Sequence, residues 1–341
     1  MKKIAYKNLD LLYNELSSLQ ELYLPVRKAG ATNFAKFEQG AAVDVESLQT
    51  VKSAKDLFFP QSEDMIEFKT QGKNIEIIDA RAKANPFVLF GVRACDLKSF
   101  EVLDKVFLAE PVDTMYKNKR DAVTVITLAC NKPEASCFCK VFGIDASNPK
   151  GDVQATIVGD DVYFEAITDK GAELLNKLTC LEEGDGKGVE EEKASIKAKI
   201  EKLPFANLDI SAFKGDDLMP LFNRPEWEEL SKACLGCGTC TFVCPTCQCF
   251  DIRDFETNSG VKRFRCWDSC MYSEFTKMAA ENPRKNQMQR YRQRFMHKLV
   301  YFPANNDGEY SCVGCGRCVK KCPQSLNIVK VIKKLGGKNN D

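Results

Sequence analysis

The sequence contains a single histidine, His297, among 341 residues. With one imidazole the chain cannot supply the paired histidines of a zinc protease, and we exclude histidine-based triads as well. No apolar run reaches the roughly 18 residues that span a bilayer. The start, MKKIAYKNLDLLYNELSS, is basic but lacks the apolar stretch of about 7–15 residues that a secretory signal carries. We therefore expect a cytoplasmic protein with no membrane partner.

Net charge is also nearly absent, since 49 Lys and Arg residues face 48 Asp and Glu residues and leave a formal charge of +1. The net charge therefore does not indicate binding to nucleic acid or to an acidic partner. With 44% hydrophobic and 28% charged residues the composition is that of a globular protein. At about 100–200 residues per domain, the length predicts two domains.

Cysteine, by contrast, is abundant, with 17 residues. In a reducing compartment, and in a chain too large to need disulfide bonds, this number indicates metal or redox chemistry. The cysteines are unevenly placed, because twelve of them lie between Cys234 and Cys322. The other five are Cys95, Cys130, Cys137, Cys139 and Cys180.

The pattern of apolar residues predicts an α+β protein with an α/β domain over residues 1–180. Short β-branched or aromatic runs indicate strands at 75–79, 87–92, 122–128 and 162–166. Helices are expected at 6–19 and 171–180, and after Asp96 as a plausible N-cap. Residues 181–215 are expected to form a charged linker that includes a solvated helix. Residues 216–341 should form a second, mainly helical domain, with helices at 226–233, 271–280, 286–299 and 326–335.

Two cysteine runs define the C-terminal domain. They read Cys234-x2-Cys237-x2-Cys240-x3-Cys244-Pro245 and Cys312-x2-Cys315-x2-Cys318-x3-Cys322-Pro323. Both match the bacterial ferredoxin spacing, in which three cysteines hold one [4Fe-4S] cluster and the fourth ligates the other cluster. We therefore assign one cluster to Cys234, Cys237, Cys240 and Cys322, and the second to Cys312, Cys315, Cys318 and Cys244.

The alternative for these runs is a pair of zinc sites with four thiolates each, which would use separate C-x2-C pairs rather than two triplets. The glycines between the ligands favour the clusters, because small residues let the backbone approach an inorganic core. The 67 residues between Cys244 and Cys312 exceed what a compact bacterial ferredoxin needs. We expect helices to fill this interval, so that residues 216–341 form an α-helical ferredoxin-like domain.

Four further cysteines follow the first run, and four thiolates are what another cluster requires. They are Cys247, Cys249, Cys266 and Cys270. The simpler interpretation is that some of them are small buried apolar residues. An additional metal centre and inert packing both stay open here.

In the N-terminal half, Cys95 lies at the turn before a predicted helix, and Cys130, Cys137 and Cys139 follow a predicted strand. If the two strands before these loops are parallel neighbours, both loops emerge at the same edge of the sheet, where ligands usually bind. A four-thiolate site at that edge is one hypothesis, and structural cysteines are the other. We expect Cys180 to be packed without a ligand role. The total would then be two to four [4Fe-4S] clusters.

A basic segment lies between the two runs, with no acidic residue between Asn282 and Lys298. It could bind nucleic acid, which we do not expect because one basic helix in a neutral chain is a weak signal. We favour docking of another protein chain, or neutralisation of the anionic clusters.

Several strings together resemble the 4Fe-4S dicluster subunits of two kinds of enzyme, anaerobic sulfite reductases and cytoplasmic sulfhydrogenases, in the latter case the beta subunit. They are FVLFGVRACDLKSFEVLDKVF (87–107), SCFCKVFGID (136–145), CLGCGTCTFVCPTCQCFDI (234–252), WDSCM (267–271), RYRQRFMHKLVYF (290–302) and CVGCGRCVKKCP (312–323). Cys266 departs from the pattern expected before WDSC, which leaves the identity of an extra centre open.

The resemblance implies an electron-transfer subunit of a soluble anaerobic complex. Its partners would be a flavoprotein that binds FAD and NAD(P)H and a catalytic subunit of the sulfite reductase, hydrogenase or heterodisulfide-reductase type. The sequence carries no nucleotide-binding fingerprint, which agrees with a flavin site on another chain. The alternative is a self-sufficient reductase of a sulfur compound or disulfide at the N-terminal cysteines.

Overall fold

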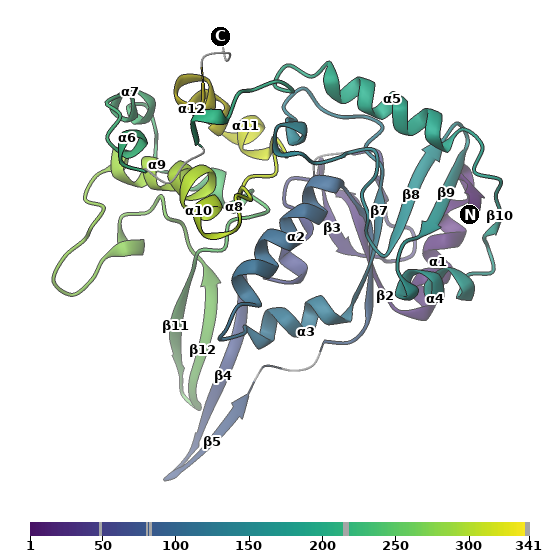
Figure 1. The fold of residues 1–341 in the computed structure, drawn as a ribbon. Helices are drawn as coiled ribbons and strands as arrows, with labels where there is room; N and C mark the ends of the chain where they lie inside the picture. Colours follow the sequence, from purple (N-terminus) through teal and green to yellow (C-terminus); the bar gives the residue numbers. More distant parts are fainter. Residues whose placement is uncertain (48–49, 80, 82–83, 214–217, 338–341) are drawn as a thin grey trace.

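The computed structural model describes residues 1–47, 50–79, 81, 84–213 and 218–337. Its first part is a mixed sheet of eight strands in the order β10-β1-β9-β8-β7-β6-β2-β3 (Figure 1). The strands are β1 (Lys2–Ala5), β2 (Glu21–Lys28), β3 (Ala31–Lys36), β6 (Phe87–Val92), β7 (Val123–Leu128), β8 (Val153–Val158), β9 (Asp161–Ala166) and β10 (Glu182–Glu183). Strands β2, β6, β7 and β8 are parallel neighbours. Every residue of β6 and β7 is buried, as expected of central parallel strands.

Helices accompany this sheet. They are α1 (Leu9–Leu19), α2 (Ala94–Phe107), α3 (Thr114–Ala122), α4 (Asp169–Lys177) and α5 (Val189–Glu201), with 3₁₀ turns η1 (Tyr6–Asn8), η2 (Ala54–Leu57) and η3 (Cys139–Phe142). The strands and helices expected from the sequence are present, but Asp96 is not the N-cap of α2. Arg93 takes that position, and Asp96 lies within the first turn, where its carboxylate accepts hydrogen bonds from Arg317.

The cysteine-rich part contains short helices. They are α6 (Met219–Phe222), α7 (Glu226–Ser231), α8 (Thr239–Phe242), α9 (Gln287–Met296), α10 (Phe302–Asn305), α11 (Arg317–Lys321) and α12 (Ile328–Leu335), with turns η4 (Ser211–Phe213) and η5 (Glu274–Thr276) and the π-helical turn η6 (His297–Tyr301). The α+β class is confirmed. The helix expected at 271–280 is absent, since within this described stretch only the short turn η5 forms.

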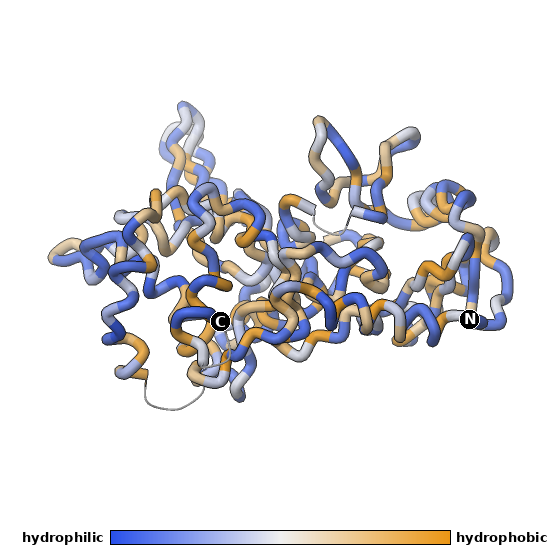
Figure 2. The backbone as a smooth tube through the Cα atoms, turned by 90° about the horizontal axis from the view of Figure 1, so that it is seen from above, coloured by the Kyte–Doolittle hydropathy of each residue, from blue (hydrophilic) through white to orange (hydrophobic). Residues whose placement is uncertain are grey.

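A long β-hairpin links the two parts of the chain. The sequence pattern did not predict it. Strands β11 (Phe250–Thr257) and β12 (Gly260–Trp267) pair with β4 (Ser62–Gln71), which pairs with β5 (Asn74–Asp79). This four-stranded sheet, which we call the arm, projects away from the rest of the molecule (Figure 1). Seen from above, the molecule is elongated, with the N-terminus near one end and the C-terminus in the opposite half (Figure 2).

The segment predicted as a linker, 181–215, contains α5, whose Val189, Ile196 and Ile200 are buried. Residues 214–217 and 338–341 of the predicted linker and C-terminal domain lie outside the described residues. The division at 181–215 stays a prediction. The arm shows that the two parts also share a sheet, because β4 comes from the N-terminal half and β12 from the C-terminal half.

Candidate iron–sulfur site

The two cysteine runs have the same local backbone. Gly236 and Gly314 have φ values of 65° and 59°, and Gly238 and Gly316 have φ values of 72° and 76°. These left-handed conformations favour glycine. The second glycine of each pair forms the N-cap of a short helix, α8 in one run and α11 in the other. The duplicated spacing thus produces a duplicated loop.

Four of the predicted ligands line one cavity. Cys234, Cys237 and Cys240 share it with Cys322 of the other run. Hydrogen bonds reach two of these sulfur atoms, from Gln287 Nε2 to Cys234 Sγ at 3.4 Å and from the Leu326 amide to Cys322 Sγ at 3.3 Å. Such bonds help to set the potential of an iron–sulfur centre.

The other four predicted ligands are also brought together. Cys244 lies within electrostatic range of Cys312 and Cys315. Cys318 is within range of the same two thiols. Cys322 thus shares a cavity with the triplet of the other run, whereas Cys244 and Cys318 also lie within electrostatic range of Cys240. The assignment of each fourth cysteine to the cluster of the other run stays a prediction.

Buried cations surround these thiols. Arg294 is 2% exposed and donates from Nη2 to the Cys240 carbonyl at 3.1 Å, while its Nε and Nη1 atoms are buried without a protein partner among the described residues. Burial lowers the pKa of Arg294, but the thiols of Cys240 and Cys318 outweigh it and hold the pKa above its usual value. An unpaired buried cation is unfavourable unless an anion lies beside it. An anionic iron–sulfur core at this cavity would meet that requirement.

Two buried lysines hold the backbone around Cys244. Lys298, in the π-helical turn, donates to Thr246 Oγ1 at 2.8 Å and to the Ser311 carbonyl at 3.1 Å. Lys55 comes from the N-terminal half and donates to the carbonyls of Cys244 and Cys247 at 3.2 and 2.9 Å. Its ammonium group also lies 3.7 Å from the centroid of Trp267. Nothing in the sequence around Lys55 signals this role.

The basic segment is thus partly internal. Arg294 and Lys298 face the cysteines, as the hypothesis of cluster neutralisation predicts. Arg292 stacks on Phe222, with the guanidinium carbon 3.5 Å from the ring centroid, and donates to its carbonyl. Arg292, Arg294 and Lys298 are therefore among the residues of the basic segment that contact other parts of this chain.

Three of the four further cysteines gather near Cys244. The thiols of Cys244 and Cys247 are hydrogen-bonded, and so are those of Cys249 and Cys270. The bond from Cys270 lowers the pKa of Cys249 to about 7. Cys266 lies elsewhere, in β12 between Asp251 of β11 and Ser62 of β4. An extra centre at Cys247, Cys249, Cys266 and Cys270 stays a prediction.

The N-terminal cysteines also converge. Strands β6 and β7 are parallel neighbours, so the loops that follow them leave the same edge of the sheet. Cys95, Cys130, Cys137 and Cys139 line one cavity, together with Cys315 of the second run. Cys180 lies apart, beyond the end of α4 at Lys177, and its amide donates to Glu15.

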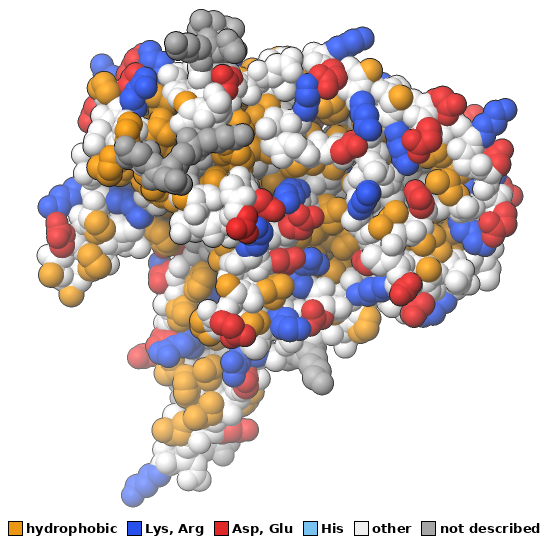
Figure 3. Space-filling model, viewed as in Figure 1, with side chains coloured by type: hydrophobic (Ala, Val, Ile, Leu, Met, Phe, Trp, Pro, Cys, Tyr) orange, Lys and Arg blue, Asp and Glu red, His pale blue; other side chains and the backbone are white. Residues whose placement is uncertain are grey.

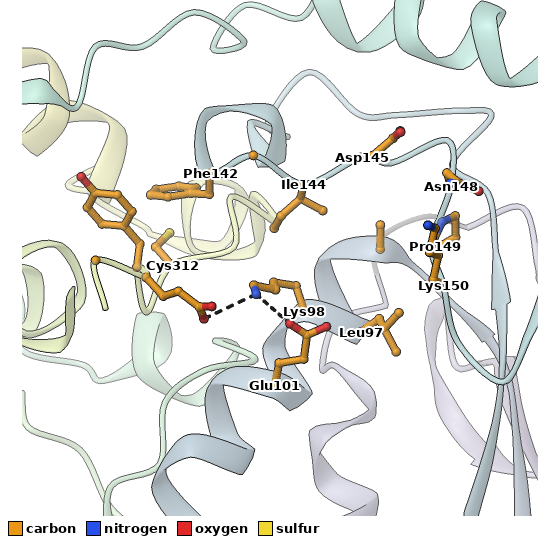
Figure 4. Close-up of a pocket in the computed structure, with 15 residues that line it drawn as sticks. Leu97, Lys98, Glu101, Phe142, Ile144, Asp145, Asn148, Pro149, Lys150 and Cys312 are labelled. Atoms are coloured by element: carbon orange, nitrogen blue, oxygen red, sulfur yellow. Dashed lines mark hydrogen bonds and ion pairs between the residues drawn. The ribbon is translucent and has the colours of Figure 1, made fainter. Parts of the chain in front are cut away.

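A wider cleft of about 460 Å³ opens beside the second run (Figure 4). Its walls are the start of α2, the loop 142–150 and the loop 308–312, and Cys312 is one of the residues that line it. Lys98 of α2 bonds to Glu101 and reaches Glu309 across the cleft at 3.5 Å. The cleft gives solvent a route toward the second set of cysteines.

In the described part of the chain, no group of three or more His, Cys, Asp or Glu side chains is arranged to hold a metal ion directly. The thiols line cavities instead, which suits a core larger than one ion. Four thiolates around such a core are the ligand set of a [4Fe-4S] cluster.

Residues 233–326 match the family model of the 4Fe-4S dicluster domain. These residues form a 4Fe-4S dicluster domain. The predicted iron–sulfur cofactor, with two [4Fe-4S] clusters, is thereby confirmed.

The whole chain is similar to sulfhydrogenase 2 subunit beta of Pyrococcus furiosus, with 29% identity over 334 residues, which cover 95% of this chain and 94% of the relative. The resemblance to sulfhydrogenase beta subunits is confirmed. No solved structure matches the chain. Among the described helices, none combines the length and the apolar character needed to cross a bilayer.

Proposed function

We propose that this chain is an electron-relay subunit of a cytoplasmic anaerobic oxidoreductase complex. The observation that supports the proposal most directly is that Cys322 of the second run lines one cavity with the triplet of the first run. Bound [4Fe-4S] clusters supply one-electron transfer. We assign Cys234, Cys237, Cys240 and Cys322 to one cluster and Cys312, Cys315, Cys318 and Cys244 to the other.

The protein's own contribution is to position the thiols and to offset their charge. Arg294 and Lys298 are almost completely buried beside both sets, so their positive charges stabilise thiolates there. Phe295 and Tyr291 line the first cavity and exclude water from it. Burial and charge are the means by which a protein sets the potential of such a centre.

The proposed partners are a flavoprotein that binds FAD and NAD(P)H and a catalytic redox subunit. The similarity to a subunit named as part of a sulfhydrogenase supports a complex, as does one apolar face of the arm. Phe68, Ile75, Ile77 and Val261 share this face by strand register, and Ile75 and Ile77 are each 67% exposed. Apolar side chains gather on the arm's surface (Figure 3). Exposed apolar patches of this kind mark contacts with other proteins.

The alternative of a self-sufficient reductase at the N-terminal cysteines has less support. Cys137 and Cys139 are buried, at 9% and 6% exposure. A sulfur compound or disulfide would need direct access to a reactive thiol or centre. The second run, moreover, lies against this cavity and closes it on one side.

The ligand assignment is tested by paired variants of the full chain, purified without oxygen. If the runs cross, Cys234→Ser with Cys322→Ser removes one cluster, because both residues hold the same one. The pair Cys234→Ser with Cys244→Ser removes two. The measured loss should be about four irons for the first pair and about eight for the second. A loss of about eight irons for the first pair and about four for the second would show that each run holds its own cluster. Cys180→Ser is the matched control and should lose none.

The relay is tested on the complex purified from its native host through a tag on this chain. The partner fraction should contain FAD, and NADH or NADPH should reduce the clusters, followed by EPR of the rapidly frozen complex. The pair Cys234→Ser with Cys322→Ser should keep the flavin reducible but stop electron delivery to the catalytic subunit. Full turnover by that variant would refute the relay while leaving the cluster assignment intact.

A further inference from the structure

The N-terminal cysteines form a second kind of site, outside the dicluster domain. Cys95 is in the first turn of α2, directly after β6, and Cys130 follows β7 by two residues. Cys137 and Cys139 lie further along the same loop and reach back to Cys130, because the thiol of Cys139 is within electrostatic range of both. The fold brings together four thiols that are up to 44 residues apart in sequence.

The cavity that these thiols line is enclosed by buried groups. Ala146 and Ile200 of α5 form its apolar wall, and Ile200 belongs to a small core that includes Cys139. Two arginines complete the lining, Arg93 and Arg317, which are 4% and 3% exposed. Because this cavity is enclosed and lined by four thiols and two buried cations, an anionic core suits it better than solvent does.

The two arginines differ in how their charges are offset. Arg317 is paired with the buried carboxylate of Asp96, at 2.5 and 2.7 Å, and also bonds to Thr50. Arg93 donates to the carbonyls of Ala129 and Val45 and lines the same cavity as the four thiols. A buried guanidinium bonded to neutral carbonyls is stabilised by an anion beside it. Thiolates that ligate a metal core supply this negative charge.

The cavity is also joined to the dicluster domain through the backbone. The Phe138 amide, between Cys137 and Cys139, donates to the Gly314 carbonyl at 2.8 Å. A Cβ atom at Gly314 would lie 2.4 Å from the Phe138 carbonyl oxygen and 2.6 Å from the Cys139 nitrogen. This contact holds the N-terminal loop against the loop of Cys312 and Cys315, and Cys315 lines the cavity.

We propose that Cys95, Cys130, Cys137 and Cys139 hold a third [4Fe-4S] cluster, next to the one assigned to Cys315. Four thiolates fit zinc or an iron–sulfur core. The cavity favours the core, because these thiols line a space rather than converge on one point. A cluster beside Cys315 would add a third redox centre to the proposed electron relay and would extend it into the N-terminal half of the chain. In this respect the inference rests on the proposed function. The ligand set itself does not depend on that function.

The test is the metal content of the full chain, purified without oxygen. Iron, acid-labile sulfide and zinc are measured per polypeptide for the wild type and for Cys137→Ser with Cys139→Ser. We expect the variant to lose about four irons and four sulfides and to keep the EPR signals of the two dicluster centres. Loss of no metal, of one zinc, or of two irons would overturn the proposal.

Two further variants guard against misinterpretation. Cys180→Ser, in the same half of the chain but outside the cavity, should keep all of the iron. If Cys137→Ser with Cys139→Ser does not fold, the iron content of Cys247→Ser with Cys249→Ser tests the proposal instead. About twelve irons in that background would support the third cluster, and about eight would overturn it. Loss of relay with the third cluster present would refute only the proposed function.

Discussion

The contact between Gly314 and Phe138 predicts that Gly314→Ala is far more damaging than an ordinary glycine substitution. The backbone at Gly314 has φ of 59°, and an alanine in this left-handed conformation costs about 1–2 kcal/mol. The new Cβ would also lie 2.4 Å from a backbone oxygen, whereas ordinary contact begins at 3.4 Å. The two loops must therefore separate by about 1 Å, at an overpacking cost of roughly 1–3 kcal/mol.

The same separation weakens the hydrogen bond from the Phe138 amide to the Gly314 carbonyl, which is worth about 1 kcal/mol. The expected total is about 3–6 kcal/mol. Gly308→Ala is the matched control, because Gly308 has φ of 78° but no atom within 4 Å of the added Cβ. It should cost only the backbone part, about 1–2 kcal/mol.

The assay is thermal unfolding of the iron-loaded chain without oxygen, with iron retention measured in parallel. At about 2 °C per kcal/mol for a chain of this size, Gly314→Ala should lower Tm by about 6 °C or more and Gly308→Ala by about 2–4 °C. The iron lost from Gly314→Ala should come from the centres next to this contact. Equal shifts in Tm for the two variants would refute the reasoning, because the contact would then contribute nothing.

Three other predictions follow from buried or exposed side chains. Burial and two neighbouring cations lower the pKa of His297 to about 4. Because the unfolded chain has a pKa near 6.5, the free energy of unfolding falls by up to about 3 kcal/mol as the pH drops from 6.5 to 4, and His297→Gln should remove this slope in denaturant titrations. Asp96→Asn leaves the buried Arg317 without its carboxylate and should cost about 3–5 kcal/mol in the same assay. Ile75→Glu with Ile77→Glu should keep full iron content and Tm but lose co-purification with partner subunits.

Control variants or contradicting outcomes test these predictions. Lys117→Ala removes the exposed ion pair with Asp121 and should change the free energy of unfolding by less than about 1 kcal/mol. If Asp96→Asn has an equally small effect, the buried pair of Asp96 and Arg317 does not stabilise the fold as we predict. Phe255→Glu alters an exposed residue on the opposite face of the arm and should leave the complex intact. An unchanged pH slope in His297→Gln would show that other groups carry it.

Much of the fold was predictable because local patterns are strong in the N-terminal half. Strands such as FVLFGV and VTVITL read as continuous apolar runs, which only a strand buried on both faces requires. The hairpin of β11 and β12 was missed, since its solvent-facing residues are mixed and its pairing partner β4 lies about 190 residues earlier. The predicted helix at 271–280 failed because turns around Ser273 and Asn282 hold that segment instead.

The sequence by itself determined the chemistry. The spacing of the two runs specifies two [4Fe-4S] clusters, because three cysteines separated by two residues each can reach one core from a single tight loop. Only the fourth ligand has to come from the other run. Local glycines, such as Gly236 and Gly314, specify the conformation of those loops for the same reason.

Only the tertiary structure decided which distant groups meet. The parallel pairing of β6 and β7 brings Cys95 to Cys130, and Lys55 reaches the carbonyl of Cys244 from 189 residues away. No spacing in the sequence encodes such meetings, since they depend on strand order and on the packing of one half of the chain against the other. The charges that surround the clusters and the neighbourhood of the N-terminal cysteines are therefore properties of the folded chain.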